Sequence, residues 1–423
     1  MIVTQQSTSS IHARTSSVQD LPRTAERLSD DILLPAETVK IRGEAREFAE
    51  RVLAPRAAEL NSAEESAEAF PYDIVREMAD AGLFAIPFSA DVGGRDLEYP
   101  MLAAATVLEE LAYYAPGVAS ALYDGQIMLV GRTLDAAPNH IRAEFLPRLI
   151  HGEIVGSFAT SEPDASTDLT ADAMRTTAVA VPGGYRLTGH KRWITNACAA
   201  DIVTVLCVVD GAQAMLLVDM HADGVTVGEP DRKMGNRLQL TSDIEFTHVF
   251  VPDNHVIAEP GRGLAAALKS LSMGRTGVAA MGVGMGQCAF DHAVVHLRRR
   301  SAFGSKLGAF QHWQFRFAEH AIALETARSL YQKAARKSDT TDASEPEAAM
   351  AKVTGSRVAV DIARDAIQVH GGYGFVRRLS ADGHINHLES IWRDSKIGEI
   401  YEGANEVQLW SIARLALGRD ITG

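Results

Sequence analysis

The sequence predicts an α+β fold in which a β domain lies between two helical domains. Residues 35–154 are rich in Ala, Glu, Arg and Leu, and their apolar residues recur three and four positions apart, as in amphipathic helices. Residues 155–260 contain short β-branched runs separated by Gly, Pro and Asp, which indicate strands. Helical periodicity returns in residues 261–423. Because strands and helices do not alternate, the order disfavours a doubly wound nucleotide-binding fold.

The N-terminal helical domain, residues 35–154, is expected to follow a mobile arm formed by residues 1–34. The first nineteen residues contain no acidic residue and many Ser and Thr, but they lack the apolar core of a secretory signal. Stretches such as GEAREFAERVLAPRAAEL and MLAAATVLEELAYYA then have the helical pattern. The run DVGG at Asp91–Gly94 marks a break between helices.

The middle domain, residues 155–260, is predicted to be a small antiparallel β domain. Its candidate strands are YRLTGHKRW, DIVTVLCVVD, AMLLVDM and DIEFTHVFVP. The last of these alternates apolar and polar residues, which indicates one packed and one solvated face.

The C-terminal domain, residues 261–423, is predicted to be a helical bundle. The segments HWQFRFAEHAIALETARSLYQKAARK and EAAMAKVTGSRVAVDIARDAIQVH are each long enough for about seven helical turns. The glycines of GVGMG at Gly282–Gly286 do not follow a strand, so we interpret them as sites of close helix packing rather than as a dinucleotide loop.

The composition argues against several classes of partner. With 41 basic and 54 acidic residues the net charge is −13, which argues against a nucleic acid or an anionic membrane as the main partner. No apolar run approaches the length of a membrane span, and no metal-ligand spacing appears. The three cysteines form no CxxC pair, which fits a reducing compartment. We expect a cytoplasmic protein, with the mitochondrial matrix as the alternative.

Four stretches of the sequence resemble the motifs of one enzyme family. They are FATSEPDASTDL (158–169), KRWITNA (191–197), RSAFGSKLGAFQ (300–311), and the pair AIQVHGGYGF (366–375) and IWRDSKIGEIYEGANEVQ (391–408). Together they resemble the acyl-CoA dehydrogenase family, over nearly the whole chain. The resemblance implies a homotetramer that binds FAD and acts in fatty acid metabolism. It also implies an N-terminal helical domain, a middle antiparallel β domain and a C-terminal four-helix bundle.

The first two stretches resemble the part of the family that surrounds the flavin ring. Hydroxyl groups on a loop can hydrogen-bond the polar edge of a flavin, and an indole offers a broad apolar plane for its face. The resemblance implies that Trp193 covers one flavin face and that Thr195 bonds its edge. It assigns the remaining contacts of this part to Phe158, Thr160, Ser161 and Thr167, of which Thr167 also contacts substrate.

The later stretches resemble the part of the family that holds the other end of FAD. An arginine fork suits the pyrophosphate, and glycines at a helix end let backbone amides approach phosphate oxygens. In the family, the arginine, phenylalanine and glutamine of the third motif reach FAD bound by a neighbouring subunit, so the resemblance implies that the active unit is an oligomer. The residues assigned to the cofactor here are Arg300, Phe303, Gln311, Gln368, Gly371, Gly372 and Glu406.

By the same resemblance, Glu402 in IYEG is the base that removes the α proton of an acyl thioester. A base for this proton must lie in a dry pocket, where burial raises the pKa of a carboxyl group. Some relatives place the base immediately before an arginine on an earlier helix, but here Gly274 precedes Arg275, so Glu402 is the only candidate and the short- and medium-chain type is favoured. Further substrate contacts are assigned to Arg275, Tyr401 and Gly403.

The resemblance implies FAD-dependent dehydrogenation of an acyl thioester to a trans-2-enoyl thioester, with electrons passed to an electron-transferring flavoprotein. Three alternatives remain open: an acyl group tethered to a carrier protein instead of coenzyme A, a flavin-dependent oxidase or N-oxygenase of the same fold, and a non-catalytic scaffold. Ala404 replaces the threonine usual after EG in the family, so we expect somewhat weaker retention of FAD.

Overall fold

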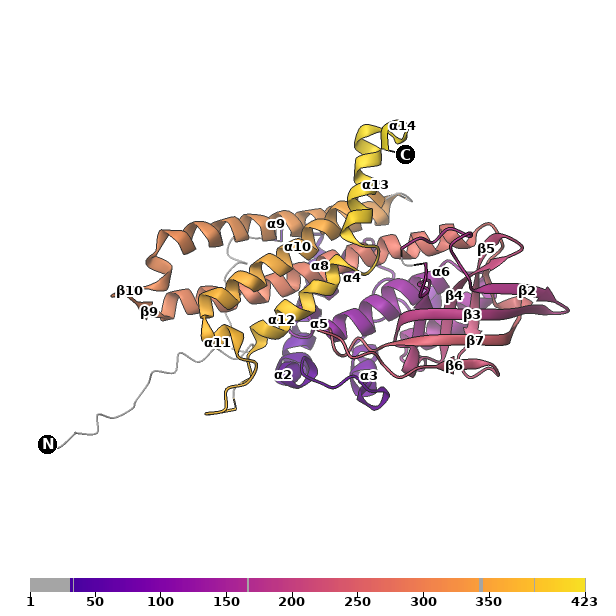
Figure 1. Cartoon of the computed structure of the whole chain (residues 1–423), viewed down its shortest axis with the longest axis horizontal. Coiled ribbons are helices and arrows are strands. Elements are labelled where there is room, and N and C mark those ends of the chain that lie inside the picture. The colour runs from indigo at the N-terminus through magenta and orange to yellow at the C-terminus, as the bar shows by residue number, and fades with distance from the viewer. Residues whose placement is uncertain (1–30, 33, 166, 342–344, 384, 423) are drawn as a thin grey trace.

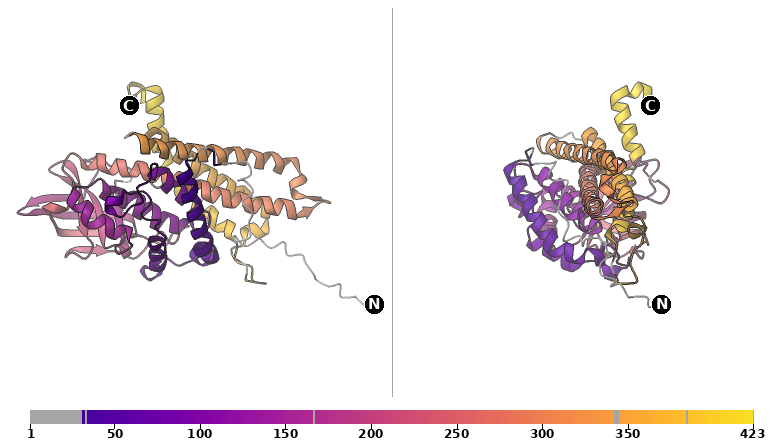
Figure 2. Two further views of the ribbon diagram at one scale, coloured as in Figure 1. Left: turned by 180° about the vertical axis from the view of Figure 1, so that it is seen from behind. Right: turned by 90° about the vertical axis from the view of Figure 1, so that its left-hand side faces the viewer.

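A computed structural model describes residues 31–32, 34–165, 167–341, 345–383 and 385–422. Most of the predicted N-terminal arm and Ser166 of the first motif therefore lie outside the described residues. The molecule is elongated, with the β domain at one end and the turn between two long helices at the other (Figures 1 and 2). The predicted order of helical, β and helical segments is confirmed.

The N-terminal helical segment packs its most apolar helices in the centre of the molecule. Helix α4 and the π-helical segment η7 are buried along almost their whole length, as the near-absence of charged residues in their sequences requires. The elements are α1 (Ala36–Phe48), η3 (Ala49–Leu53), η4 (Ala54–Arg56), α2 (Ala57–Leu60), η5 (Ala67–Ala69), α3 (Tyr72–Asp80), η6 (Ala90–Val92), α4 (Pro100–Ala112), α5 (Pro116–Val118), η7 (Ala119–Gly131), α6 (Arg132–Asp135) and α7 (Asn139–Ile150).

The β domain is one sheet with strand order β6-β7-β3-β2-β4-β5-β8, and β1 also pairs with β4. Its elements are β1 (Gly156–Ala159), β2 (Thr177–Val181), β3 (Gly184–Thr195), η8 (Ala197–Ala199), β4 (Ile202–Val209), β5 (Ala212–Asp219), β6 (Val225–Val227), β7 (Thr241–Pro252), η9 (Asp253–His255) and β8 (Val256–Ala258). The prediction of a wholly antiparallel sheet was wrong in one respect, because β4 pairs in parallel with β1 and, at one position, with β2. The connections to β4 are long enough to permit parallel pairing.

Three long helices form most of the C-terminal segment. They are α8 (Gly263–Arg299), α9 (Gln311–Thr340) and α10 (Glu345–His370), and the shorter α12 (His387–Ser395) lies beside α10 and α8 as the fourth member (Figure 1). The remaining elements are β9 (Ser301–Ala302), β10 (Ser305–Lys306), η10 (Leu307–Ala309), α11 (Gly372–Phe375), η11 (Lys396–Glu399), α13 (Asn405–Leu417) and α14 (Arg419–Thr422).

The glycines of GVGMG lie on α8, where other helices approach closely. A Cβ atom at Gly282 would lie 2.4 Å from the carbonyl oxygen of Gly355 on α10, and one at Gly284 would lie 2.2 Å from that of Glu109 on α4. The interpretation of these glycines as packing sites is confirmed.

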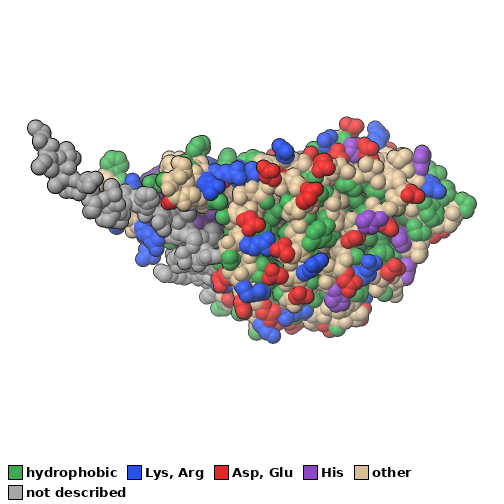
Figure 3. Space-filling view, turned by 90° about the horizontal axis from the view of Figure 1, so that it is seen from below, with side chains coloured by type: hydrophobic (Ala, Val, Ile, Leu, Met, Phe, Trp, Pro, Cys, Tyr) green, Lys and Arg blue, Asp and Glu red, His purple; other side chains and the backbone are tan. Residues whose placement is uncertain are grey.

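Helix α8 is also the one helix among the described residues that is long and apolar enough to cross a membrane. Nearly all of its apolar stretch is buried inside the protein, as in the core helix of a bundle. On the surface, acidic and basic side chains are interspersed over the face seen from below (Figure 3).

Candidate active site around Glu402

Glu402 lies in a strained turn between η11 and α13. Its φ angle is +56°, and that of the following Gly403 is +86°. A left-handed backbone costs a residue with a side chain roughly 1–2 kcal/mol, so surrounding contacts must hold this turn. Position 403 favours glycine because of its left-handed φ angle, and a Cβ atom there would also lie 2.6 Å from Nε2 of Gln408, which would have to shift.

Three side chains hold the turn through its backbone carbonyl groups. Arg275 Nε donates a hydrogen bond to the Glu402 oxygen at 3.0 Å. Lys352 Nζ and Gln408 Nε2 donate to the Gly403 oxygen at 2.9 and 3.1 Å. Arg275, assigned to substrate from the sequence, is thus a residue that positions Glu402. Lys352 was not singled out from the sequence, although a lysine in the otherwise apolar AAMAKV stretch was a visible signal.

The Glu402 carboxylate faces α8 at the position of the alternative base. A Cβ atom on Gly274 would lie 2.6 Å from Glu402 Oε2, so the absence of a side chain at 274 leaves room for this carboxylate. Oε2 is buried and has no hydrogen-bond partner in the part of the chain that the structure describes. Burial raises the pKa of Glu402 to about 7, although the positive charges of Arg275 and Lys352 oppose the rise. The site therefore holds a carboxyl group that can take up a proton near neutral pH.

A second carboxyl group, that of Asp124, lies close to the first. Asp124 comes from the buried η7 and is only 2% exposed, and its Oδ1 atom has no hydrogen-bond partner. Burial, with the negative charge of Glu402 as a further cause, raises the pKa of Asp124 well above its usual range. Asp124 was not predicted from the sequence, although it is the only charged residue in the apolar stretch ALYDGQIMLV.

The end of β3 borders the same segment. A Cβ atom on Gly125 of η7 would lie 3.4 Å from Cγ2 of Thr195. The Thr195 side chain accepts a hydrogen bond from Gln239 Nε2 at 3.2 Å, and its backbone oxygen accepts one from the Ser157 hydroxyl at 2.8 Å. The Thr195 hydroxyl is thereby oriented and can still donate its own proton. The η7 segment thus links the predicted flavin-edge residue to the carboxyl group of Asp124.

Trp193 is presented to the surface by an irregularity in β3. The pairing of β3 with β7 shifts register between Lys191 and Ile194, and Trp193 has a φ angle of +58°. Its indole is 56% exposed, although large apolar side chains are usually buried. A strained backbone that exposes an indole fits a stacking surface for a planar ligand.

The loop of the first motif is fastened to β3 by a buried ion pair. Lys191 Nζ donates to Glu162 Oε1 at 2.8 Å and to the Thr160 carbonyl oxygen at 3.1 Å. The backbone amides of Arg175 and Thr176 also donate to Glu162. The predicted contact residues of this loop range from buried to exposed, with Thr160 buried, Phe158 and Ser161 half-buried and Thr167 exposed.

The residues predicted from the later motifs gather at the far end of the long helices. Arg300, Gly371 and Gly372 line a cavity of about 500 Å³ together with His296 and His370. Burial lowers the pKa of both imidazoles to about 4, so at neutral pH Arg300 is the cationic side chain among the lining residues. A cavity whose cationic side chain is an arginine suits an anionic group such as a phosphate.

The other predicted cofactor residues fall into two groups. Phe303 lies in the β9–β10 turn and is 96% exposed, Gln311 is exposed at the start of α9, and Gln368 is exposed near the end of α10. Glu406 is exposed in the first turn of α13, close to Glu402 in the chain. Since β9 and β10 lie at the opposite end from the β domain (Figure 1), one chain does not bring the two groups together. Among the described residues, no group of three or more His, Cys, Asp or Glu side chains could hold a metal ion.

Comparisons with known proteins cover almost the whole chain. Family models of the N-terminal, middle and C-terminal domains of acyl-CoA dehydrogenases match residues 35–153, 157–249 and 261–417. The mitochondrial short-chain specific acyl-CoA dehydrogenase of Homo sapiens is 35% identical over 373 residues, which are 87% of each chain.

Two solved structures of similar proteins have the same fold. The butyryl-CoA dehydrogenase of Megasphaera elsdenii is 30% identical with a TM-score of 0.84, and the match covers 91% of this chain and 99% of that one. A structure described as PigA with FAD and proline is 26% identical with a TM-score of 0.84, and the match covers 92% of this chain and 100% of that one. These matches, together with the geometry around Glu402, show that the chain belongs to the acyl-CoA dehydrogenase family of FAD-dependent oxidoreductases.

Proposed function

We propose that the protein removes the α and β hydrogens of an acyl thioester to give a trans-2-enoyl thioester, with Glu402 as the base for the α proton. The observation that carries this proposal is the buried and unpartnered Oε2 of Glu402, held by a strained turn. An unsatisfied buried carboxyl group costs folding free energy, so its retention suits a group that acts on a ligand.

The environment of Glu402 suits abstraction of a weakly acidic proton. The carbon acid next to a thioester carbonyl needs a base whose pKa lies near the working pH, because such a base is both available in the ionised form and strong. Arg275 and Lys352 hold the turn by hydrogen bonds to its backbone carbonyl oxygens. They do not bond Oε2 of the Glu402 carboxylate, which has no hydrogen-bond partner among the described residues. FAD, when bound, supplies the acceptor for the β hydride.

The residues present fit FAD in two parts. At the end of β3, the exposed Trp193 and the hydroxyl of Thr195 suit a flavin ring, and the buried Oδ1 of Asn196 and Nε2 of Gln126 lack hydrogen-bond partners among the described residues. At the far end, the cavity beside Arg300 suits the phosphates. The end of β3 and the cavity beside Arg300 lie apart in one copy of the protein. We therefore propose that a second copy completes each FAD site in a homo-oligomer, most simply the tetramer expected from the family.

The carrier and the electron acceptor also belong to this proposal. A thioester of coenzyme A is the substrate suggested by the relatives, and a carrier-protein thioester is the alternative. An electron-transferring flavoprotein is the proposed acceptor, and the cytoplasm is the proposed location.

Anaerobic mixing of the purified flavoprotein with acyl thioesters tests the reaction. Butyryl, hexanoyl and octanoyl groups would be offered on coenzyme A and on an acyl carrier protein, and the loss of oxidised-flavin absorbance would be followed. We expect bleaching in the wild type and in Glu399→Gln, a matched control whose carboxylate pairs with Lys396 at 2.5 Å. We expect its loss in Glu402→Gln. Bleaching that is equally fast in Glu402→Gln would refute the role of Glu402, and bleaching by no thioester would favour an oxidase, an N-oxygenase or a scaffold.

A further inference from the structure

A carboxyl group that dehydrogenation does not require lies beside the proposed base. Gly274 and Gly277 are three residues apart on α8 and therefore share a face of the helix. A Cβ atom on Gly274 would lie 2.6 Å from Glu402 Oε2, and one on Gly277 would lie 2.2 Å from Asp124 Oδ1. Since Cβ atoms at this spacing are about 5–6 Å apart, the two oxygens lie at most about 11 Å from each other.

Asp124 differs in its contacts from three other buried carboxyl groups of the protein. Glu109, Glu110 and Glu162 are each bonded by a basic side chain, whereas Asp124 Oδ1, like Glu402 Oε2, is buried without a hydrogen-bond partner among the described residues. Arg275 and Lys352, the cations near Glu402, bond the carbonyl groups of the turn instead. A buried carboxyl group without a partner lowers stability, because apolar residues of similar shape fill such a site at lower cost.

We propose that the acyl group of the substrate carries an amine, and that Asp124 binds this amine. The inference rests on the proposed function and narrows its substrate class. A plain alkyl chain would leave Asp124 unpaired, and a chain that ends in a carboxylate would bring a further acidic group into a site that already holds Glu402 and Asp124. An amine supplies the missing N–H donors and, when charged, a charge-assisted hydrogen bond.

The amine is a binding group and does not react. The bonds that break are still those from Cα and Cβ to hydrogen, with the proton going to Glu402 and the hydride to FAD. Because the two carboxylate oxygens lie at most about 11 Å apart, one acyl group can present Cα to Glu402 and its amine to Asp124.

Matched pairs of coenzyme A thioesters test this inference. The first pair is 5-aminopentanoyl and hexanoyl, and the second is prolyl and cyclopentanecarbonyl, so that each amine has a hydrocarbon counterpart with the same number of heavy atoms. The nitrogen is at the end of the chain in 5-aminopentanoyl and is bonded to Cα in prolyl. We expect the amine of at least one pair to exceed its counterpart by about tenfold or more in kcat/KM for flavin reduction.

The variant Asp124→Leu should reverse this preference, so that the hydrocarbon member becomes the better substrate. Asp124→Asn serves as a second variant if the leucine variant does not fold. Asp339→Asn is the matched control, because it alters a carboxyl group on α9 that accepts hydrogen bonds only from the backbone amides of Met101 and Leu102. It should leave the preference unchanged.

Binding without turnover separates this inference from the proposed function. In the Glu402→Gln background, the dissociation constants of the same thioesters would be measured from the change in flavin absorbance. We expect Asp124→Leu to weaken binding of the preferred amine about tenfold or more and to leave its hydrocarbon counterpart nearly unaffected. Equal affinities within both pairs, unchanged by Asp124→Leu, would overturn the inference even if alkyl thioesters bleach the flavin. If no thioester bleaches the flavin, the reaction proposal fails and the binding data still decide the role of Asp124.

Discussion

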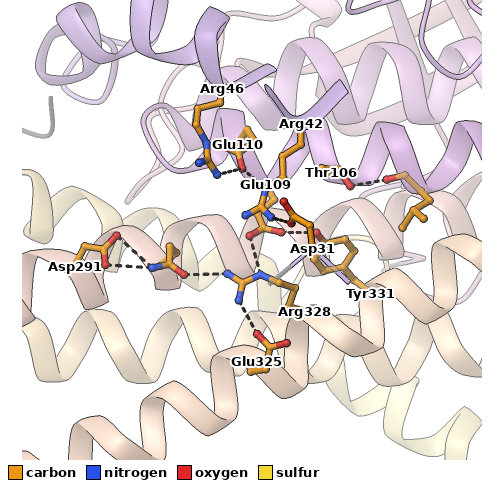
Figure 4. A network of polar contacts seen from close by, with 12 residues as sticks. Asp31, Arg42, Arg46, Thr106, Glu109, Glu110, Asp291, Glu325, Arg328 and Tyr331 are labelled. Atoms are coloured by element: carbon orange, nitrogen blue, oxygen red, sulfur yellow. Dashed lines mark hydrogen bonds and ion pairs between the residues drawn. The ribbon is translucent and has the colours of Figure 1, made fainter. Parts of the chain in front are cut away.

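Two groups of buried charges lie in the helical core, and they differ in one respect. In the network drawn in Figure 4, the two glutamates of α4 have cationic partners: Arg328 Nε lies 3.0 Å from Glu109 Oε1, and Arg42 Nε lies 2.9 Å from Glu110 Oε1. Around η7 and α8, by contrast, Glu402 Oε2 and Asp124 Oδ1 have no hydrogen-bond partner among the described residues.

The paired network explains how the N-terminal helices join the C-terminal bundle. Arg328 and Tyr331 come from α9, Glu109 and Glu110 from α4, and Arg42 from α1, and the Tyr331 hydroxyl donates to Glu109 (Figure 4). Such a network stabilises one arrangement of the three helices, provided that all its members are satisfied. The unpaired carboxyl groups lower stability and leave hydrogen-bonding capacity for a ligand. Both regions bury charged residues. What distinguishes the candidate active site from the paired network is that two of its carboxylate oxygens lack hydrogen-bond partners among the described residues.

The largest effect should come from Glu402→Gln, which removes the proposed base and keeps its shape. We expect the rate of anaerobic flavin reduction by the best thioester to fall by about 10²–10⁴-fold. Stopped-flow absorbance measures this rate. Conservative changes at the surface of α9 serve as the comparison. They should leave the rate of flavin reduction within twofold of wild type.

Removing one partner from the paired network should cost the most stability. Arg328→Met leaves the buried Glu109 without its cation, and we expect a loss of about 3–5 kcal/mol in the free energy of unfolding. Urea denaturation measures it, with Arg336→Met on the exposed side of the same helix as the control. A loss below about 0.5 kcal/mol for Arg328→Met would contradict the view that the network holds the helices together.

At the site without partners, Glu402→Gln should stabilise the protein, and the gain in stability should depend on pH. The pKa of Glu402 is raised to about 7 by burial, so the folded state binds a proton more tightly than the unfolded state, and its stability falls as pH rises from the usual glutamate pKa towards 7. Glu402→Gln removes this loss. Its melting temperature relative to wild type should therefore be higher at pH 8 than at pH 5, and an equal difference at both values would argue against a raised pKa.

The smallest effect is expected at Ala404, the residue that precedes α13. It is the N-cap of this helix and provides no side-chain hydrogen bond. Ala404→Thr should add a cap worth about 0.5–2 kcal/mol, measured by denaturation of the purified flavoprotein. A parallel measurement of FAD dissociation tests whether the threonine also improves retention of the cofactor. A threonine that changes neither quantity would show that this position is neutral.

The sequence allowed the order of helical and β segments to be predicted, because hydrophobic periodicity is a local property. The motifs predicted Glu402, Trp193 and Thr195 as site residues. The roles of Lys352 and Asp124 could not be predicted, because they depend on contacts between segments far apart in the chain. The parallel pairing of β1 with β4 was missed for the same reason, since both strands have ordinary strand patterns and only their pairing is unusual.

The pH dependence of anaerobic flavin reduction by the best thioester tests the central claim most directly. If Glu402 is a buried base with a raised pKa, kcat/KM should rise with pH and level off above about 7, and this rise should be absent from the residual reaction of Glu402→Gln. A rise with the same midpoint in Glu402→Gln, or a flat profile in the wild type, would contradict the account.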